Sequence, residues 1–173
     1  MEQLLELIMK HCKNIKFLDL NINVNQIIYS ALNLIENIKQ NLNYLSIKTY
    51  YNKELSSFLL QKLGQIIPPK LEYLDLYLCN VKACDFEVFL KKSQDTFIKK
   101  LLISNIKVQV ILPFIKTYIM KKRRAKYLAI NDTGNEWFSF KDEVKEFMLY
   151  DIKVQSYYDL VINLYDFILK ELN

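Results

Sequence analysis

The segment Lys70–Asn80 constrains the fold more than any other part of the chain, because it reads L-x-x-L-x-L-x-x-C. Successive side chains of a β-strand point to opposite faces. Leu71, Leu74 and Leu76 are therefore predicted to point into a core. The residues that alternate with them are predicted to face solvent: Tyr73, Asp75 and Tyr77.

The first, fourth and sixth positions of this motif are apolar, and they recur at intervals of 27, 29, 27, 27 and 19 residues. We predict a strand at each occurrence. In chain order the positions are Ile15, Leu18, Leu20; Leu42, Leu45, Ile47; Leu71, Leu74, Leu76; Ile98, Leu101, Ile103; Ala125, Leu128, Ile130; and Val144, Phe147, Leu149. The segments Asn105–Gln109 and Asp151–Gln155 match at a spacing of 46 residues, which equals the interval between the fourth and sixth occurrences and supports this register.

Helices are predicted between the strands, because apolar residues recur there at helical spacing. These residues are Val24, Ile27, Ile28, Ala31, Ile35 and Ile38; Leu55, Phe58, Leu59 and Leu63; Phe86, Phe89 and Leu90; and Ile111, Ile115, Tyr118 and Ile119. Pro68 and Pro69 are expected to end one helix just before its following strand. Pro113 is expected in the first turn of another, where a missing N–H does no harm.

Strands and helices in this alternation predict an α/β fold with a parallel sheet and right-handed crossovers. Repetition at 27 to 29 residues further predicts a curved solenoid with about six strands on the concave face and helices on the convex face. The whole chain, residues 1–173, is predicted to be one domain. An irregular insertion, a loop or an extra short strand, is expected at residues 131–141, because the 19-residue interval is too short for a full helix and two turns.

Both ends of a solenoid need a cover for their apolar faces. A helix predicted over Ser156–Leu172, with a capping-box-like Asp159 in its first turn, is expected to cap the C-terminal end. At the N-terminal end, Leu5 is expected to point outward, toward a preceding repeat, so the domain is expected to be truncated there. The other apolar residues of this first helix are expected to face the fold: Leu4, Leu7 and Ile8.

The formal net charge is +5, with 22 lysines and only two arginines. The densest basic run, Lys121–Arg124, is expected to be a solvated helix end, since no element that reads nucleic acid accompanies it. Nucleic acid is therefore an unlikely partner. No apolar run approaches about 18 residues and no signal peptide is evident, so we expect no membrane association and a cytoplasmic or nuclear location.

The sequence offers no catalytic residues, metal ligands or cofactor motif. Cys12, Cys79 and Cys84 are too scattered for a disulfide framework or a zinc site. The single histidine, His11, lies at a helix end where it cannot oppose a nucleophile. Asp19 and Asp75 are two repeats apart, roughly 10 Å by strand spacing, which is too far for an acid pair. We therefore expect a protein that is not an enzyme.

The segment His11–Leu20 and the ninth-position Cys79 resemble the cysteine-containing leucine-rich repeat, which is related to the ribonuclease-inhibitor kind. Together with the Pro-Pro-Lys-Leu-Glu-Tyr-Leu-Asp-Leu sequence, they resemble F-box/leucine-rich-repeat proteins, the substrate receptors of SCF-type ubiquitin ligases. The resemblance covers Leu4 to Leu172 but includes no F-box. It also departs from the family at the ninth position of four units: Tyr50, Ile106, Thr133 and Ile152.

The third, fifth and seventh positions of each strand would line the concave face, and this face is the candidate protein-binding site. The candidate residues are Phe17, Asp19, Tyr44, Lys48, Tyr73, Asp75, Tyr77, Lys100, Tyr127 and Tyr150. The aromatic residues among them suit either a protein-binding surface or simple packing across strands. Two functions follow. The first is the target-recognition domain of a ubiquitin-ligase substrate receptor, which would bind the ligase adaptor only if an F-box precedes it. The alternative is a free-standing inhibitor or scaffold.

Overall fold

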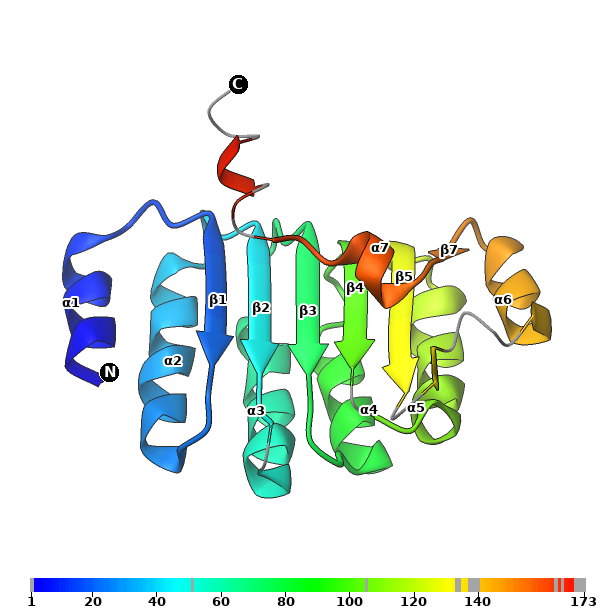
Figure 1. The fold of residues 1–173 in the computed structure, drawn as a ribbon, viewed down its shortest axis with the longest axis horizontal. Helices are drawn as coiled ribbons and strands as arrows, with labels where there is room; N and C mark the ends of the chain where they lie inside the picture. Colours follow the sequence, from blue (N-terminus) through cyan, green and yellow to red (C-terminus); the bar gives the residue numbers. More distant parts are fainter. Residues whose placement is uncertain are drawn as a thin grey trace.

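The computed structural model describes residues 2–50, 52–104, 106–132, 135–136, 141–163, 165 and 167–169. Within them, helices and strands alternate along the chain (Figure 1). The first elements are α1 (Glu2–His11), β1 (Phe17–Asn21), α2 (Asn25–Ile38), β2 (Tyr44–Lys48), α3 (Lys53–Ile66), β3 (Tyr73–Tyr77), α4 (Ala83–Lys92) and β4 (Ile98–Ser104). The later ones are α5 (Val108–Phe114), the π-helix η1 (Ile115–Met120), β5 (Ala125–Asp132), β6 (Asn135–Glu136), α6 (Lys141–Met148), β7 (Lys153–Val154) and α7 (Tyr157–Leu160).

The strands form one sheet in chain order, in which β1 to β5 and β7 are all parallel. The fourth positions of the motif are mutual partners across the sheet: Leu18, Leu45, Leu74, Leu101 and Leu128. Helices α2 to α5 lie behind the sheet (Figure 1). The predicted α/β fold with a parallel sheet is thus confirmed, and the more specific assignment to a leucine-rich-repeat solenoid stays a prediction.

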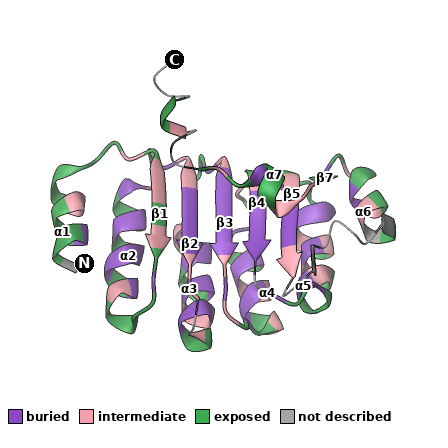
Figure 2. Cartoon of the chain, viewed as in Figure 1, coloured by how far each residue is buried: buried purple, intermediate pink, exposed green. Residues whose placement is uncertain are grey.

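The core lies between the sheet and the helices behind it. Leu45, Leu74 and Leu101 are completely buried there, and the helices contribute equally buried residues such as Leu59 and Phe89. Figure 2 shows this burial along β2 to β4, with exposed surface on the outer sides of the helices. Full burial of one such side chain stabilises the fold by about 1.5–3 kcal/mol. The inward positions predicted for strands two to five are confirmed.

The sixth strand was predicted at the wrong place. Residues 141–148 form α6, with Phe147 buried, whereas Leu149 is 77% exposed. The strand that pairs with β5 in parallel fashion on its far side from β4 is β7, in which Val154 pairs with Leu128. The interval of about 27 residues therefore continues, but β7 has too few apolar residues to show the motif. The match between residues 105–109 and 151–155 misled the register, because Val108 begins α5 whereas Val154 lies in a strand.

The insertion predicted at residues 131–141 falls partly outside the described residues. β5 extends to Asp132, and the short strand β6 pairs with it in antiparallel fashion. An extra short strand was one of the two predicted alternatives. The predicted loop residues Gly134, Trp137, Phe138 and Phe140 lie outside the described part of the chain.

Pro113 lies near the end of α5 and not in its first turn, as had been predicted. A proline inside a helix removes a backbone hydrogen-bond donor and crowds the preceding turn. The chain responds by widening into the π-helix η1 directly after it, and the Thr117 hydroxyl donates to the Pro113 carbonyl at 2.9 Å. In contrast, Pro68 and Pro69 follow the end of α3 at Ile66, as predicted.

The face that α1 turns toward the fold was predicted correctly for Ile8 and incorrectly for Leu4, Leu5 and Leu7. Leu5 is only 4% exposed, whereas Leu4 and Leu7 are each 57% exposed. Leu5, Ile8 and Met9 form the stripe that packs on the core, at the i, i+3 and i+4 spacing of one helical face. The prediction overlooked Met9, which completes this stripe.

Arg124 was grouped with the solvated basic run, but it is buried beneath the end of α4. Its guanidinium donates to the carbonyls of Leu90, Ser93, Thr96 and Tyr118. Burial lowers the pKa of this guanidinium. The positive charge satisfies carbonyls that a helix end leaves without partners, and so it ties α4, η1 and β5 together.

Helices α3 and α4 pack closely together at Gly64. A Cβ placed there would lie 2.9 Å from the carbonyl oxygen of Phe89 and 3.0 Å from the Cβ of Lys92. We predict that Gly64→Ala lowers the free energy of unfolding by about 1–3 kcal/mol, although alanine is the better helix former. Urea denaturation measures the change. Gln65→Ala, an exposed change in the same helical turn, is the control and should stay within about 0.5 kcal/mol. Stabilisation by Gly64→Ala would contradict the close packing.

Candidate functional site

The candidate site is the front face of the sheet, which is the face turned away from α2 to α5. Its third-position row consists of Phe17, Tyr44, Tyr73, Lys100 and Tyr127. Its fifth-position row consists of Asp19, Ser46, Asp75, Leu102 and Ala129, and its seventh-position row of Asn21, Lys48, Tyr77, Ser104 and Asn131. The structure therefore brings together all the predicted site residues except Tyr150.

The first three residues of the third-position row form a continuous aromatic strip. The ring centroids of Phe17 and Tyr44 are 6.3 Å apart, and those of Tyr44 and Tyr73 are 6.2 Å apart. In-register parallel strands place these rings one strand apart on the same face, which is why the strip follows directly from the repeat spacing. Such rings offer a large apolar area with few rotatable bonds, which suits binding of a polypeptide.

This face is covered by the chain's own C-terminal segment, residues 155–169. After β7 the segment forms α7 in front of β4 and β5 and then runs back toward β1 (Figure 1). Leu160 of α7 is buried against Tyr73, Leu102 and Ala129. The continuous capping helix predicted over residues 156–172 is therefore wrong, because α7 ends at Leu160 and residues 161–163 are not helical. Ser156 makes no side-chain cap to this helix either.

Asp75 is the polar centre of the covered face. Its carboxylate is 1% exposed, and the Tyr157 hydroxyl lies 3.0 Å from each of its two oxygens. The Ser46 hydroxyl donates to it at a longer 3.4 Å. The nearest described lysine, Lys48, instead bonds Asp19 at 3.1 Å. A carboxylate that was predicted to face solvent is thus buried against a neutral phenol.

Two further contacts hold the C-terminal segment. The backbone N–H of Ile162 donates to the Tyr73 hydroxyl at 3.3 Å. Farther along the segment, the Phe167 ring lies 4.9 Å from the rings of both Phe17 and Tyr44, at the end of the aromatic strip that lies on β1 and β2. Tyr73 is consequently 1% exposed and not solvent-facing as predicted. The segment thus contacts five consecutive strands, β1 to β5.

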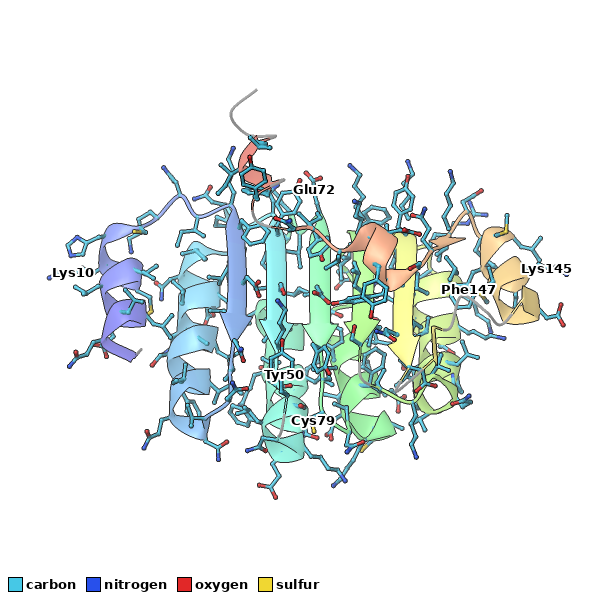
Figure 3. The ribbon with its side chains drawn as sticks, viewed as in Figure 1. Lys10, Tyr50, Glu72, Cys79, Lys145 and Phe147 are labelled. Carbon is cyan, nitrogen blue, oxygen red and sulfur yellow. The ribbon has the colours of Figure 1, made fainter. Side chains whose placement is uncertain are left out.

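The docked segment leaves a cavity of about 220 Å³ beside it. The cavity lies between the amino ends of β2 to β4 and the segment, and Figure 3 labels one of its lining residues, Glu72. The other lining residues are Tyr44, Tyr73, Lys99, Lys100, Ile162 and Phe167. This volume far exceeds the roughly 30 Å³ of a water molecule, so there is room for a further side chain.

Burial determines the ionisation of the groups at the centre of the site. Loss of solvent raises the pKa of Asp75 to about 6, and the charge of Asp19 adds to this rise. The hydrogen bond from Tyr157, the charge of Lys48 and the Ser46 hydroxyl all act in the opposite direction. Burial and the negative charge of Asp75 raise the pKa values of Tyr73 and Tyr157, so both remain protonated donors.

A raised carboxyl pKa is typical of general acids, but the surroundings of Asp75 are not those of a catalytic group. Both of its oxygens are occupied by Tyr157, and almost none of its surface is open to a substrate. In the part of the chain that the structure describes, no group of three or more potential metal ligands comes together. No helix among these residues is long and apolar enough to cross a membrane. What lies on this arrangement in the structure is the chain's own C-terminal segment.

The remaining predicted site residues lie around the edges of this centre. Asp19 and Lys48 form an ion pair, and the ring of Tyr77 lies 4.7 Å from that of Tyr50, which Figure 3 places beyond the other end of the strands. The ammonium of Lys126 lies 5.6 Å from the Tyr127 ring. Tyr150 is misplaced in the prediction, because it follows α6 and packs on the main core.

The functional residues that sequence reasoning missed are all in the C-terminal segment: Tyr157, Leu160, Ile162 and Phe167. Tyr157, Leu160 and Ile162 cannot all lie on one face of a helix. This spacing is the signal that could have indicated a break in the predicted helix. Comparison of the chain with protein-family models, with curated proteins and with solved structures finds no significant match. The site must therefore be interpreted from its own chemistry.

We predict that Asp75→Asn stabilises the protein at pH 7.5 by roughly 1–3 kcal/mol, because asparagine keeps an acceptor for Tyr157 without a buried charge. The pKa of Asp75 is higher in the folded than in the unfolded protein, so protonation of Asp75 stabilises the folded state. This stabilisation is fully present below about pH 4 and is lost as the pH rises through 6. The advantage of Asp75→Asn should therefore vanish near pH 4.

Urea denaturation of the wild type and of Asp75→Asn at about pH 4 and about pH 7.5 tests this prediction, because these two pH values lie on either side of the titration of Asp75. Asp159→Asn, an exposed change in α7, is the control and should have little effect at either pH. An unchanged difference between wild type and Asp75→Asn across the two pH values would contradict the buried-carboxylate interpretation.

Proposed function

We propose that this protein is a non-enzymatic protein-interaction module of the leucine-rich-repeat kind, and that its front face binds a polypeptide segment of a partner. One observation carries the proposal: a polypeptide segment, residues 155–169, already lies on this face and is held by a buried hydrogen bond and by aromatic contacts. A surface that accommodates one polypeptide segment has the shape and donors and acceptors to accommodate another.

One feature of the sequence and one of the structure support the leucine-rich-repeat form of the proposal. The apolar motif recurs at about 27 residues, and the resulting strands are in register and parallel, with helices behind them. The resemblance to F-box/leucine-rich-repeat proteins makes a ubiquitin-ligase substrate receptor the more specific form of the function. The alternative is a free-standing inhibitor or scaffold that occupies its partner without marking it.

The proposal predicts that partner binding depends on the front face and not on the helices. Partners are captured by cross-linking the full chain in cells that express it, and are quantified by mass spectrometry. Lys100→Glu with Tyr127→Ala, on the front face, should lower recovery of a genuine partner about tenfold or more. Lys62→Glu with Tyr29→Ala is the matched control on the helix side.

Equal recovery with both variant pairs, or loss only with the helix-side pair, would refute front-face binding. The same experiment separates the two forms of the function. Recovery of the ligase adaptor and cullin together with the chain would identify a substrate receptor, whereas recovery of a target alone would favour the inhibitor or scaffold.

A further inference from the structure

The C-terminal segment, residues 155–169, has a conformation that its own sequence does not favour. Val161 ends α7 with an extended backbone, φ −60° and ψ 133°, although the sequence from Gln155 to Asn173 contains no glycine or proline to break a helix. A continuous helix would gather Leu160, Val161, Leu164, Phe167 and Ile168 on one stripe. Contacts with the front face, and not local preference, therefore hold the observed path.

The docked segment leaves apolar side chains on its outer side. Tyr158 is 71% exposed, and Val161, Tyr165 and Ile168 are also exposed. Single exposed apolar side chains are common on protein surfaces, but a group of them on one short segment marks a surface that can make a further contact. Here the inner set binds the sheet while the outer set remains available, as expected for a segment with a second conformation.

Two features weaken the binding of the segment to the front face. Docking removes the Asp75 carboxylate from water and gives it a phenol but, among the described residues, no ion pair in return. Burial of a charge without a paired cation opposes docking. In addition, the cavity lined by Lys100 and Ile162 remains unfilled, so packing between segment and sheet is incomplete. A ligand that fills this cavity would bind better than the segment itself.

From these observations we propose that residues 155–169 are an internal competitor of the partner, and that the partner binds through a segment of the same chemistry. That segment presents a tyrosine hydroxyl to Asp75, followed by a branched aliphatic residue and then an aromatic ring that enters between Phe17 and Tyr44. This inference rests on the proposed function. The order of the three groups follows from the hydrogen bond of the Tyr157 hydroxyl, the packing of the Ile162 side chain beside Tyr73 and the ring contacts of Phe167.

Electrostatics favour a partner segment with acidic flanks. The C-terminal residues 155–173 include Asp159, Asp166 and Glu171 but a single lysine, in a chain whose net charge is positive. Among the described residues of the front face, Lys48 pairs with Asp19 and Lys99 pairs with Glu72, which leaves Lys100, beside the cavity, to meet an acidic flank. Complementary charge of this kind speeds association and orients the incoming chain.

A fluorescent synthetic peptide of residues 155–173 tests the proposal by binding to the full chain. An attached segment acts at an effective concentration of about millimolar, so wild-type protein should bind the peptide weakly. A loosened full chain, Tyr157→Phe with Phe167→Ala, should bind it at least about tenfold more tightly. The matched control is Tyr158→Phe with Ile168→Ala, which changes a tyrosine and an apolar residue that both lie on the exposed side of the segment. This control should bind the peptide as weakly as the wild type does.

The peptide itself provides the test of the tyrosine. A Tyr157→Phe peptide should bind the loosened chain about tenfold or more weakly, whereas a Tyr158→Phe peptide should bind normally. Release of the segment should also increase the helical signal of the loosened chain in far-ultraviolet circular dichroism. A urea transition verifies that the loosened chain is folded, and Tyr157→Phe alone serves if the double variant is not.

Several outcomes would overturn the proposal: equal peptide affinity in wild-type and loosened chains, no binding to the folded loosened chain, or no effect of Tyr157→Phe in the peptide. A wild-type dimer that the loosened chain cannot form would assign the segment to a second copy instead. Failure of the proposed function is distinguishable, because it appears as front-face substitutions without effect on the captured partner, whatever the peptide does.

Discussion

Parallel sheets are usually covered on both faces, and this tendency accounts for the arrangement of the whole molecule. The helices α2 to α5 cover one face and bury the leucine rows, of which Leu74 is typical. The other face carries an aromatic strip that includes Tyr44 and Tyr73. Its cover comes from residues 155–169, so the C-terminal end of the chain completes what the repeated units leave open.

The cover differs in kind from the helical layer. Behind the sheet, apolar side chains meet apolar side chains, and the contact is favourable at every pH. In front, the central contact joins the Tyr157 phenol to the buried Asp75 carboxylate. Water solvates a carboxylate better than this buried position does, so burial of the carboxylate opposes the contact. The helical layer therefore supplies most of the stability, whereas the front cover is the part that a competing molecule can displace.

The repeat spacing predicted the strands β1 to β5, their register and the inward position of Leu74, because each unit has the same apolar pattern and packs only on its neighbours. The spacing could not predict β7, since the first and sixth motif positions there are Asp151 and Ser156 and only the fourth, Val154, is apolar. It placed Asp75 on the correct face, yet its burial depends on contact with Tyr157, which lies 82 residues away in sequence. Periodicity within a segment contains no information about such distant contacts.

The long sequence separation of the front cover has a consequence for biosynthesis. The bonds from Tyr157 to Asp75 and from Ile162 to Tyr73 span 82 and 89 residues, whereas the strand pairs join neighbouring units. A chain made from its N-terminus can pair β1 to β4 while residues 155–169 are still within the ribosome. The aromatic strip is thus uncovered on the nascent chain, and its first possible encounter with another molecule precedes completion of the protein's own C-terminal end.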